Sequence, residues 1–227
     1  MSNIGFRVFQ RIERPPQELV AVFKGFGVAN VGDAMGRFRV MDYQIKSINK
    51  PGVKMAGPAV TVRVRPGDNL MLHKALDLAQ EGDVLVVDAQ ESSLNGLWGE
   101  IMTKMAMKKR LAGLVMDGGV RDSYDIRELG FPVFTRAVIA AGGDKDGLGE
   151  VNVPVNCGGV PVNPGDIILG DDDGVVVVPR LEAVTVAKLT KEIMAKEAEM
   201  MKQIEEGTID RSWVDKTLRQ RGCEIID

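Results

Sequence analysis

Apolar and polar residues change their spacing repeatedly between residues 57 and 135, as they do where strands alternate with helices. Residues 57–65 alternate in the manner of a half-buried strand. Residues 83–88 form a continuous apolar run between two aspartates, which is typical of a central strand covered on both faces. The segments predicted next are a helix over 99–112, a strand over 114–117, a helix over 121–129 and a strand over 131–135. This alternation indicates an α/β fold with parallel strand pairing.

Beyond residue 150 the pattern changes to short extended runs, over 151–156, 167–169 and 175–178. The sequence Asp171-Asp172-Asp173-Gly174 predicts a hairpin turn before the last run, and a metal cluster is the weaker interpretation. Residues 181–206 then predict a long charged helix, and a short helical stretch follows it. We therefore expect a core domain over residues 1–180 and a C-terminal helical arm over 181–227 that packs on the core or contacts a neighbouring subunit.

Composition narrows the class of protein. The chain has 227 residues, 44% of them hydrophobic, and a formal net charge of -3. This charge, and the lack of basic clusters with aromatic residues, argue against a nucleic-acid partner. No apolar stretch reaches membrane-spanning length, and the first residues lack the apolar segment of a signal peptide, so we expect a cytoplasmic protein with no membrane partner. Cys157 and Cys223 have no motif spacing, so neither a disulfide framework nor a zinc knuckle is predicted.

The single histidine, His73, restricts the chemistry that is available to the chain. The usual histidine-based zinc sites need at least two imidazoles, and a serine triad has no nucleophile-elbow sequence to support it. His73 falls in a predicted amphipathic helix over 68–80, where a structural or surface role fits the pattern. Carboxylates, Arg, Lys and a hard metal ion remain. No glycine spacing matches a nucleotide-binding fingerprint, so no nucleotide cofactor is expected.

The strongest candidate site is the turn that follows the strand predicted over 114–117. Gly118 and Gly119 are expected to end this strand and to expose backbone N–H groups, and Arg121 and Asp122 follow at the mouth of a helix. Such a place attracts anions. Arg121 is suited to a carboxylate or oxyanion, and Asp122 to a divalent metal. The alternative is a plain strand–turn–helix connection in which Asp122 only favours the helix dipole.

Two other stretches bear on this turn. Glu100 opens the preceding helix, and a strand–helix unit of this length is expected to return it to the same sheet edge, where a small carboxylate ligand fits. The glycine-rich residues 142–149 resemble a calcium loop, but the third ligand position of an EF-hand falls on Leu148, so that motif fails. We expect a loop near the active site instead.

These residues resemble the signature of a known family. Glycine at 99, Glu100, twenty intervening residues and then Arg121-Asp122 resemble the acidic-x20-Arg-Asp motif of the 4-hydroxy-4-methyl-2-oxoglutarate / 4-carboxy-4-hydroxy-2-oxoadipate aldolases. Their superfamily includes the regulator of ribonuclease activity A and proteins once labelled demethylmenaquinone methyltransferases. Four core segments of the family are also similar to this chain, at residues 83–88, 117–122, 155–159 and 164–171, and the likeness covers residues 15–180. The helices beyond residue 180 are similar to the aldolase branch and are largely missing from the shorter regulator branch.

The resemblance implies an α-β-β-α sandwich of the swivelling β/β/α type also seen in phosphohistidine domains. It implies trimers, or hexamers built from two trimers, with active sites between subunits. It also implies a class II pyruvate aldolase that requires Mg2+ or Mn2+. Its substrates would be 4-carboxy-4-hydroxy-2-oxoadipate, cleaved to pyruvate and oxaloacetate, and 4-hydroxy-4-methyl-2-oxoglutarate, cleaved to two pyruvates. Oxaloacetate decarboxylation would accompany this activity, and aromatic-compound degradation would be its setting.

Carried over to this sequence, the resemblance implies a role for each matching residue. Asp122 would ligate the metal directly, and Glu100 would act on it through water. Arg121 would contact the pyruvyl oxygen and offset the charge of the enolate. The residues implied for binding the pyruvate carboxylate through backbone N–H groups are Gly99, Glu100, Ile101 and Met102. Lys145 and a neighbouring subunit's Glu197 match family positions that line the same pocket, Glu197 through water to the metal, although a solvated helix face is the plainer interpretation of Glu197.

Two alternatives stay open at the level of the sequence. A Schiff-base aldolase would use Lys145 as its amine, would need no metal and would be trapped by borohydride. A non-catalytic regulator that binds a ribonuclease or helicase would need only a complementary surface. The acidic–Arg–Asp signature and the C-terminal extension favour the metal-dependent enzyme.

Overall fold

The computed structural model describes residues 3–226. Two compact units make up the chain, and the first unit reaches Thr190 while the second begins at Lys191. The boundary lies inside helix α6 (Ala183–Glu205), beyond the position expected from the sequence. The first turns of α6 belong to the core because Ala183, Val186 and Thr190 are buried there. The second unit holds the rest of α6 and α7 (Ser212–Gln220).

The first unit is built on a mixed sheet whose centre is parallel, as the alternating pattern predicts. The strands run in the order β1-β8-β3-β4-β6-β7-β2, and β3–β4, β4–β6 and β6–β7 pair in parallel. The bounds of these strands are β1 Phe6–Val8, β2 Lys46–Ser47, β3 Met55–Val64, β4 Val84–Asp88, β6 Gly113–Val120, β7 Val133–Val138 and β8 Gly149–Val151. The carboxyl ends of the four parallel strands therefore lie at one edge of the sheet.

Strand β3 also belongs to a second group of strands. Its first residues pair antiparallel with β11 (Ile167–Asp171), and β11 pairs with β12 (Gly174–Val178). The turn between β11 and β12 is the hairpin predicted at Asp171–Gly174. The hairpin of β9 (Val155–Cys157) and β10 (Val160–Val162) lies on the same side of the main sheet.

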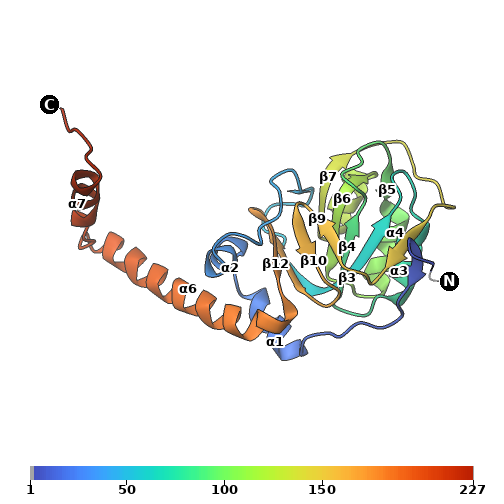
Figure 1. Cartoon of the computed structure of the whole chain (residues 1–227), viewed down its shortest axis with the longest axis horizontal. Coiled ribbons are helices and arrows are strands. Elements are labelled where there is room, and N and C mark those ends of the chain that lie inside the picture. Colours follow the sequence, from blue (N-terminus) through green and yellow to red (C-terminus); the bar gives the residue numbers. More distant parts are fainter. Residues whose placement is uncertain (1–2, 227) are drawn as a thin grey trace. The chain divides into compact units, whose positions relative to one another are not determined.

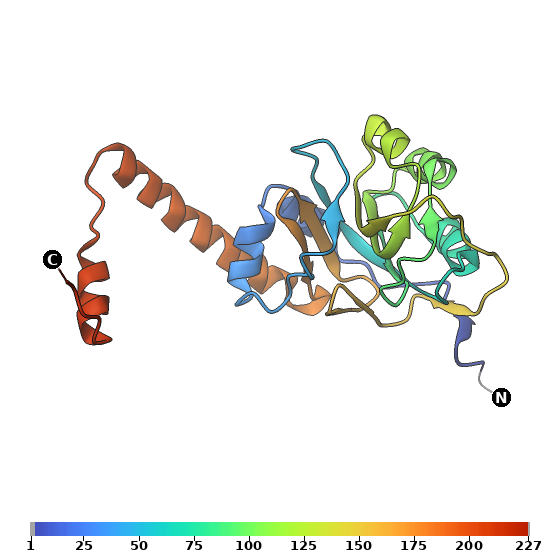
Figure 2. The ribbon, with the colours of Figure 1, turned by 90° about the horizontal axis from the view of Figure 1, so that it is seen from above.

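Helices form the two outer layers (Figures 1 and 2). One face of the main sheet is covered by α3 (Leu70–Leu78), α4 (Glu100–Lys108) and α5 (Ser123–Leu129). Beyond the second group of strands lie α1 (Gln17–Lys24) and α2 (Val28–Ala34), which contact β3, β11 and β12. The α/β class with a mixed sheet is thus confirmed, and the order of layers is α-β-β-α. Across residues 3–226, no helix combines the length and apolar content that spanning a bilayer requires.

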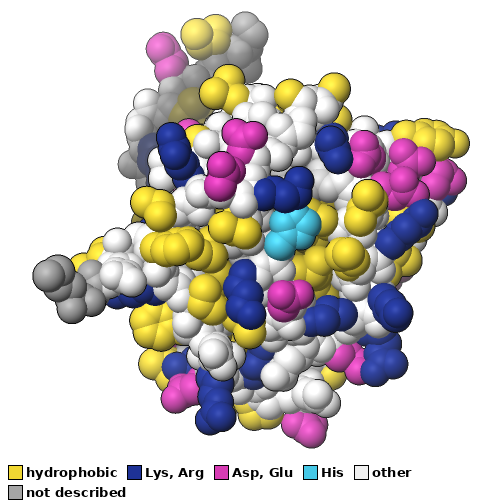
Figure 3. Space-filling view, turned by 90° about the vertical axis from the view of Figure 1, so that its right-hand side faces the viewer, with side chains coloured by type: hydrophobic (Ala, Val, Ile, Leu, Met, Phe, Trp, Pro, Cys, Tyr) yellow, Lys and Arg dark blue, Asp and Glu magenta, His cyan; other side chains and the backbone are white. Residues whose placement is uncertain are grey.

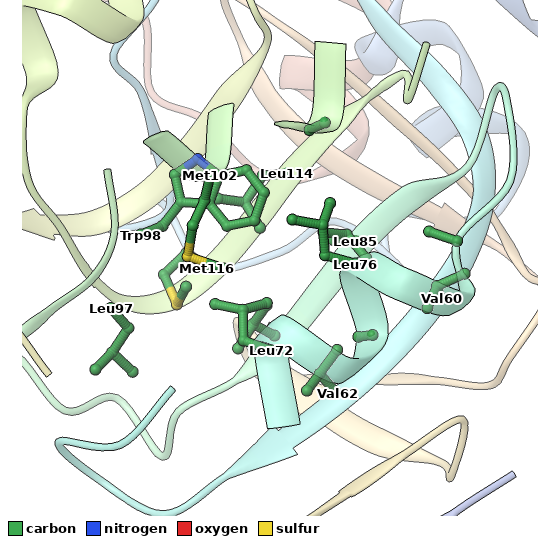
Figure 4. Close-up of a cluster of buried hydrophobic side chains, with 14 of the residues drawn as sticks. Val60, Val62, Leu72, Leu76, Leu85, Leu97, Trp98, Met102, Leu114 and Met116 are labelled. Atoms are coloured by element: carbon green, nitrogen blue, oxygen red, sulfur yellow. The ribbon is translucent and has the colours of Figure 1, made fainter. Parts of the chain in front are cut away.

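The apolar run of β4 explains how both faces of the sheet are filled. Its residues are all buried, and successive side chains point to opposite faces. Leu85 and Val87 belong to the buried cluster between the sheet and α3, α4 and α5, and Figure 4 shows Leu85 within this cluster. Val84 and Val86 pack towards the second group of strands. Each large side chain buried in this way stabilises the fold by about 1.5–3 kcal/mol.

Candidate active site

A hollow of about 270 Å³ lies at the carboxyl edge of the parallel strands. It is formed where the segments after β3, β6 and β7 meet β5 (Gly96–Trp98) and the start of α4. The side chains and backbone that line it are those of Asn69, His73, Gly96, Leu97, Trp98, Gly99, Ile101, Met102, Arg121, Asp122, Gly142, Gly143 and Lys145. Of the residues singled out from the sequence, six therefore surround one space: Gly99, Ile101, Met102, Arg121, Asp122 and Lys145.

The double glycine behaves differently from the prediction. Strand β6 does not stop at Gly118 but continues to Val120, because the short strand β5, which the sequence did not predict, pairs with Gly119 and Val120. Both glycines are buried in the sheet and do not present an anion seat. Their role is close packing: a Cβ on Gly119 would lie 2.6 Å from the Asn95 carbonyl oxygen, and one on Gly118 would lie 2.8 Å from the Ala89 Cβ.

Arg121 and Asp122 form the turn between β6 and α5. The Arg121 N–H donates to the Trp98 carbonyl at 2.8 Å, which fixes the turn against β5. Asp122 has a left-handed backbone with φ of 55°, and α5 begins one residue later, at Ser123. The helix predicted from residue 121 is therefore shorter at its start. Aspartate is one of the few side chains that tolerates this conformation, and it turns both side chains towards the hollow.

The N-terminus of α4 supplies the free N–H groups that the glycines do not. The first intrahelical bond of α4 runs from the Thr103 N–H to the Gly99 carbonyl at 3.0 Å, so the N–H groups before it have no partner within the helix. The Glu100 N–H donates to Asp122 Oδ2 at 3.0 Å. The N–H groups of Ile101 and Met102 remain at the border of the hollow, where they favour an anion.

Gly99 allows this arrangement because it has no side chain. A Cβ at residue 99 would lie 2.4 Å from Asp122 Oδ2 and 3.2 Å from Arg121 Cγ. Any other residue would have to displace the carboxylate or the arginine. Gly99 thus brings the α4 N-terminus, Arg121 and Asp122 into direct contact.

Glu100 is not among the residues that line the hollow, although its backbone N–H binds the Asp122 carboxylate. Its Oε1 accepts a hydrogen bond of 2.5 Å from Lys104, one helical turn further along α4. This bond raises the pKa of Lys104. Both side chains are exposed to solvent, and a pair of this kind contributes little to stability. The carboxylate is accordingly available to exchange its partner.

Arg121 and Asp122 are neighbours but do not neutralise each other fully. The distance from Arg121 Nε to Asp122 Oδ2 is 3.7 Å, and the two side chains are 45% and 38% exposed. This distance is too long for a hydrogen bond. The guanidinium keeps its N–H donors for another acceptor, and the carboxylate keeps lone pairs for a cation or a donor.

Two polar side chains of the hollow, those of His73 and Asn69, were not predicted as site residues from the sequence. They lie one turn apart near the start of α3, so both face the same side. Burial lowers the pKa of His73, and the Lys145 ammonium lowers it further against a smaller opposing effect of Asp77. The structural or surface role expected for His73 overlooked this position. The four-residue spacing of Asn69 and His73 was the available signal, but nothing in the sequence showed where that helix face points.

The histidine is visible in Figure 3, in cyan, among basic and apolar side chains on this face of the molecule. The loop over residues 142–145, which carries Lys145, forms another wall of the hollow. The expectation of a glycine-rich loop near the site agrees with this position. A Cβ on Gly142 would lie 2.8 Å from Arg121 Nη1, so the loop approaches the guanidinium through its backbone.

Asp122 is the carboxylate in the hollow that could hold a divalent cation. Within residues 3–226, no group of three or more His, Cys, Asp and Glu side chains is arranged to hold a metal ion. Mg2+ commonly uses one or two protein carboxylates and takes its other ligands from water and substrate. A half-exposed aspartate beside free N–H groups fits such a cation together with an anionic ligand. Glu197 lies on an exposed part of α6 in the second unit, and its role in a neighbouring subunit's site stays a prediction.

Comparison with known sequences gives a consistent family. The family model described as "RraA-like: Aldolase/RraA" matches residues 28–177. A provisionally named 4-hydroxy-4-methyl-2-oxoglutarate aldolase of Halalkalibacterium halodurans is 34% identical over 202 residues, which cover 88% of this chain and 96% of the relative. A 4-hydroxy-4-methyl-2-oxoglutarate aldolase of Thermus thermophilus is 36% identical over 126 residues, or 56% of this chain and 76% of the relative.

A solved structure bears on the alternative function. Streptomyces coelicolor RraAS2, described as an unusual member of the RNase ES inhibitor RraA protein family, superposes with a TM-score of 0.73 and 31% identity. The match covers 86% of this chain and 99% of that protein. This coverage is more than residues 1–180 would provide. A protein named for ribonuclease inhibition therefore matches beyond the core, and the C-terminal extension separates the two functions less well than the sequence suggested.

Proposed function

The chain belongs to the Aldolase/RraA family, and we propose that it is a lyase that cleaves a 4-hydroxy-2-oxo acid to pyruvate with the help of Mg2+ or Mn2+. One observation carries this proposal: Arg121, Asp122 and the free N–H groups of α4 line the same hollow. A 2-oxo acid presents a carboxylate next to a carbonyl oxygen. The hollow offers a helix N-terminus for the first and an arginine for the second. The relatives named as aldolases support the reaction class.

The chain's own residues divide the work in the proposed reaction. The Ile101 and Met102 N–H groups bind the substrate carboxylate at the positive end of α4. Arg121 donates to the carbonyl oxygen, and its fixed charge offsets the negative charge that develops there as the carbon–carbon bond breaks. Asp122 would hold the divalent cation, which polarises the 2-oxo group as a Lewis acid when bound. We infer that the carboxylate of Glu100, in the first turn of α4, orients a water molecule that takes the proton of the 4-hydroxyl group as the carbon–carbon bond breaks.

We propose 4-carboxy-4-hydroxy-2-oxoadipate and 4-hydroxy-4-methyl-2-oxoglutarate as substrates. The hollow of about 270 Å³ is slightly smaller than the pockets of about 300–1,000 Å³ that bind drug-sized ligands, as expected for a small acid. Lys145 supplies a positive charge for a distal carboxylate. Oxaloacetate decarboxylation follows from the same residues, because it also leaves an enolate of pyruvate. Trimers or hexamers would add a neighbour's Glu197, and aromatic-compound degradation is the proposed setting.

One assay tests the proposal directly. Pyruvate release is measured from 4-carboxy-4-hydroxy-2-oxoadipate, from 4-hydroxy-4-methyl-2-oxoglutarate and from oxaloacetate, before and after EDTA treatment and after Mg2+ is added back. We expect turnover that EDTA abolishes and Mg2+ restores. Activity that survives EDTA, together with a borohydride-stable adduct of pyruvate on Lys145, would instead establish the Schiff-base mechanism. If the trapped adduct does not form in Lys145→Met, Lys145 is the amine that reacts with pyruvate.

A regulatory function is the second candidate, because RraAS2 superposes over most of this chain. Such a function needs a partner surface and no turnover. Tight binding of a ribonuclease in a pull-down, combined with no pyruvate from any of the three substrates, would favour it over the enzyme. Binding that persists in Asp122→Ala and Arg121→Ala would show that the hollow is not part of the surface that binds the partner.

A further inference from the structure

The wall of the hollow that carries Lys145 is fastened by a residue outside the lining, Asp68. This carboxylate lies between β3 and α3 and is only 4% exposed. Its Oδ2 accepts N–H bonds from Asp146 at 2.8 Å and from Gly147 at 2.6 Å. Its Oδ1 accepts the Leu70 N–H at 2.8 Å. A buried carboxylate with three such bonds is firmly held, because hydrogen bonds to a charged acceptor are the stronger kind.

The loop is tied to the same segment on the other side of Lys145. The Asp144 N–H donates to the Gly67 carbonyl at 2.8 Å, and the Asn69 N–H donates to the Asp144 carbonyl at 2.9 Å. Residues 144 and 146 are therefore both bonded to residues 67–69. Lys145 lies between these two attachment points, so its backbone has little freedom to move.

Packing shows that this contact leaves no spare room. A Cβ on Gly147 would lie 2.5 Å from Asp68 Cγ and 2.7 Å from its Cβ. A Cβ on Gly142 would lie 2.8 Å from Arg121 Nη1. The loop thus uses glycine where it touches Asp68 and where it touches Arg121. Four residues separate these two points of close approach.

We propose that Asp68 is a positioning residue that holds Lys145 in the hollow, beside His73 and in a fixed relation to Arg121. It does not line the hollow, and it acts by accepting the backbone N–H groups of the loop and of the first turn of α3. The same carboxylate thereby sets the two walls that carry Lys145 and His73. For catalysis, this role rests on the proposed function. The placement of Lys145 can be measured without it.

The chain's single histidine gives a direct measurement. Lys145 lowers the pKa of His73, so an NMR titration of the one imidazole reports whether the ammonium is in place. We expect Lys145→Met to raise this pKa, and Asp68→Asn to raise it as well, because the amide turns N–H groups towards the loop and releases it. Loss of the Asp68 charge alone would lower the pKa of His73, so the direction identifies the displacement of Lys145.

A double variant tests whether the effect of Asp68 on His73 passes through Lys145. With Asp68→Asn in a Lys145→Met background, we expect no rise in the pKa of His73 above the value for Lys145→Met. The proposal is wrong if Asp68→Asn leaves the pKa at the wild-type value. It is also wrong if Asp68→Asn raises the pKa equally in both backgrounds, since the effect then does not pass through Lys145. Asp144→Asn is the matched control, because it removes an exposed charge from the same loop, and we expect no change.

A second variant protects the test against misfolding of Asp68→Asn. Gly147→Ala leaves the carboxylate intact but pushes against it, and Gly147 needs no left-handed backbone. We expect the same rise in the pKa of His73. If Gly147→Ala is folded by thermal melting and keeps the wild-type pKa, the proposed contact between Asp68 and the loop does not control Lys145.

Measurements of aldolase turnover test whether Asp68 also matters for catalysis. A misplacement of about 1 Å can cost roughly 100-fold in rate, and we expect Asp68→Asn to lose activity on this scale while a cooperative thermal melt shows that the variant is folded. In the Lys145→Met background the further loss should be much smaller. Equal losses in both backgrounds would contradict a role through Lys145. If the wild type has no aldolase activity, the proposed function fails, while the NMR result still decides the role of Asp68.

Discussion

Two arginine–aspartate pairs lie near the same end of β6, and they differ in almost every physical respect. Arg136 Nε and Asp117 Oδ1 are 2.6 Å apart, and the side chains are 8% and 4% exposed. Arg121 Nε and Asp122 Oδ2 are 3.7 Å apart, and both side chains are partly in solvent. The first pair is closed and buried, whereas the second is open.

The buried pair connects four parts of the core. Asp117 lies in β6 and Arg136 in β7, and the second carboxylate oxygen of Asp117 accepts the Gly158 N–H at 2.7 Å. Arg136 also donates to the Gln44 side chain. Its remaining nitrogen, Nη2, is buried without a hydrogen-bond partner among residues 3–226. These bonds use the charges for holding elements together and leave the carboxylate no room for a ligand.

The open pair shows the opposite use of the same two residue types. Asp122 accepts one N–H, from Glu100, and Arg121 makes no short contact with it. The charged groups of Arg121 and Asp122 line the hollow together with the N-terminus of α4. The comparison indicates that a charged pair becomes available for chemistry when its partners are held close by glycines and backbone bonds but not saturated by each other.

The largest effect is expected for Asp122→Ala, which removes the carboxylate of the open pair. Loss of a Lewis-acid site should cost at least about 5 kcal/mol of transition-state stabilisation, or roughly 10⁴-fold in kcat/KM. The Tm should fall by only about 2–4 °C, because the side chain is partly exposed and an alanine in the left-handed backbone of residue 122 costs about 1 kcal/mol. Steady-state pyruvate release measures the loss of kcat/KM, and a thermal melt measures the change in Tm. Retained aldolase activity would remove Asp122 from the proposed mechanism.

Next in size is Asp117→Ala, which breaks the closed pair. It leaves the buried Arg136 with only the more distant and more exposed Asp42 carboxylate, 3.8 Å away, and we expect a loss of about 3 kcal/mol in the free energy of unfolding. Urea titration monitored by tryptophan fluorescence measures it. The double variant Asp117→Leu/Arg136→Met should recover most of the loss, since no charge then stays unpaired. A loss below about 1 kcal/mol in the single variant would show that the pair is not closed in solution.

Arg121→Lys comes third and tests the shape of the open pair while its charge is kept. A lysine cannot reproduce the planar fork of N–H donors. We expect a fall in kcat of about 10²–10³-fold, the range for loss of one oxyanion donor. KM should change much less. If lysine supports wild-type kcat, Arg121 contributes only its charge.

Gly99→Ala is expected to have the smallest effect of the four on the comparison. An added Cβ at residue 99 would lie 2.4 Å from Asp122 Oδ2, so the carboxylate must move. A shift of about 1 Å in the carboxylate corresponds to a loss of up to roughly 100-fold in kcat/KM. Metal affinity, measured by calorimetry with Mg2+ alone, should fall in parallel. An unchanged affinity would mean that the Asp122 carboxylate moves without consequence.

Much of the fold follows from spacing along the chain. The alternation of periods predicts the parallel centre of the sheet, and the Asp171–Gly174 turn is a hairpin as expected. Arg121 and Asp122 are adjacent in the sequence, so predicting the position of one turn was enough to place both of them. Glu100 reached the same sheet edge because one strand–helix unit separates it from that turn. Local patterns were sufficient for these features.

Other features depend on contacts between distant segments, which a local pattern does not contain. Strand β5 is only three residues long, and it exists because β6 is beside it. That pairing carried β6 through Gly118 and Gly119, so glycines taken for a strand end proved to be packing positions. Asn69 and His73 lie on a helix whose sequence pattern is that of any amphipathic helix. Their place in the hollow is set by the loop over 142–147.

The ten-residue strand β3 joins both groups of strands, since it pairs with β11 through its first half and with β4 through its second. Neither group can be completed without it. Loosening of the β11–β12 hairpin therefore propagates along one strand to the parallel centre, and the first unit should unfold in a single cooperative step. Pairs so distant in sequence also close large loops, which predicts slow folding for a domain of this size.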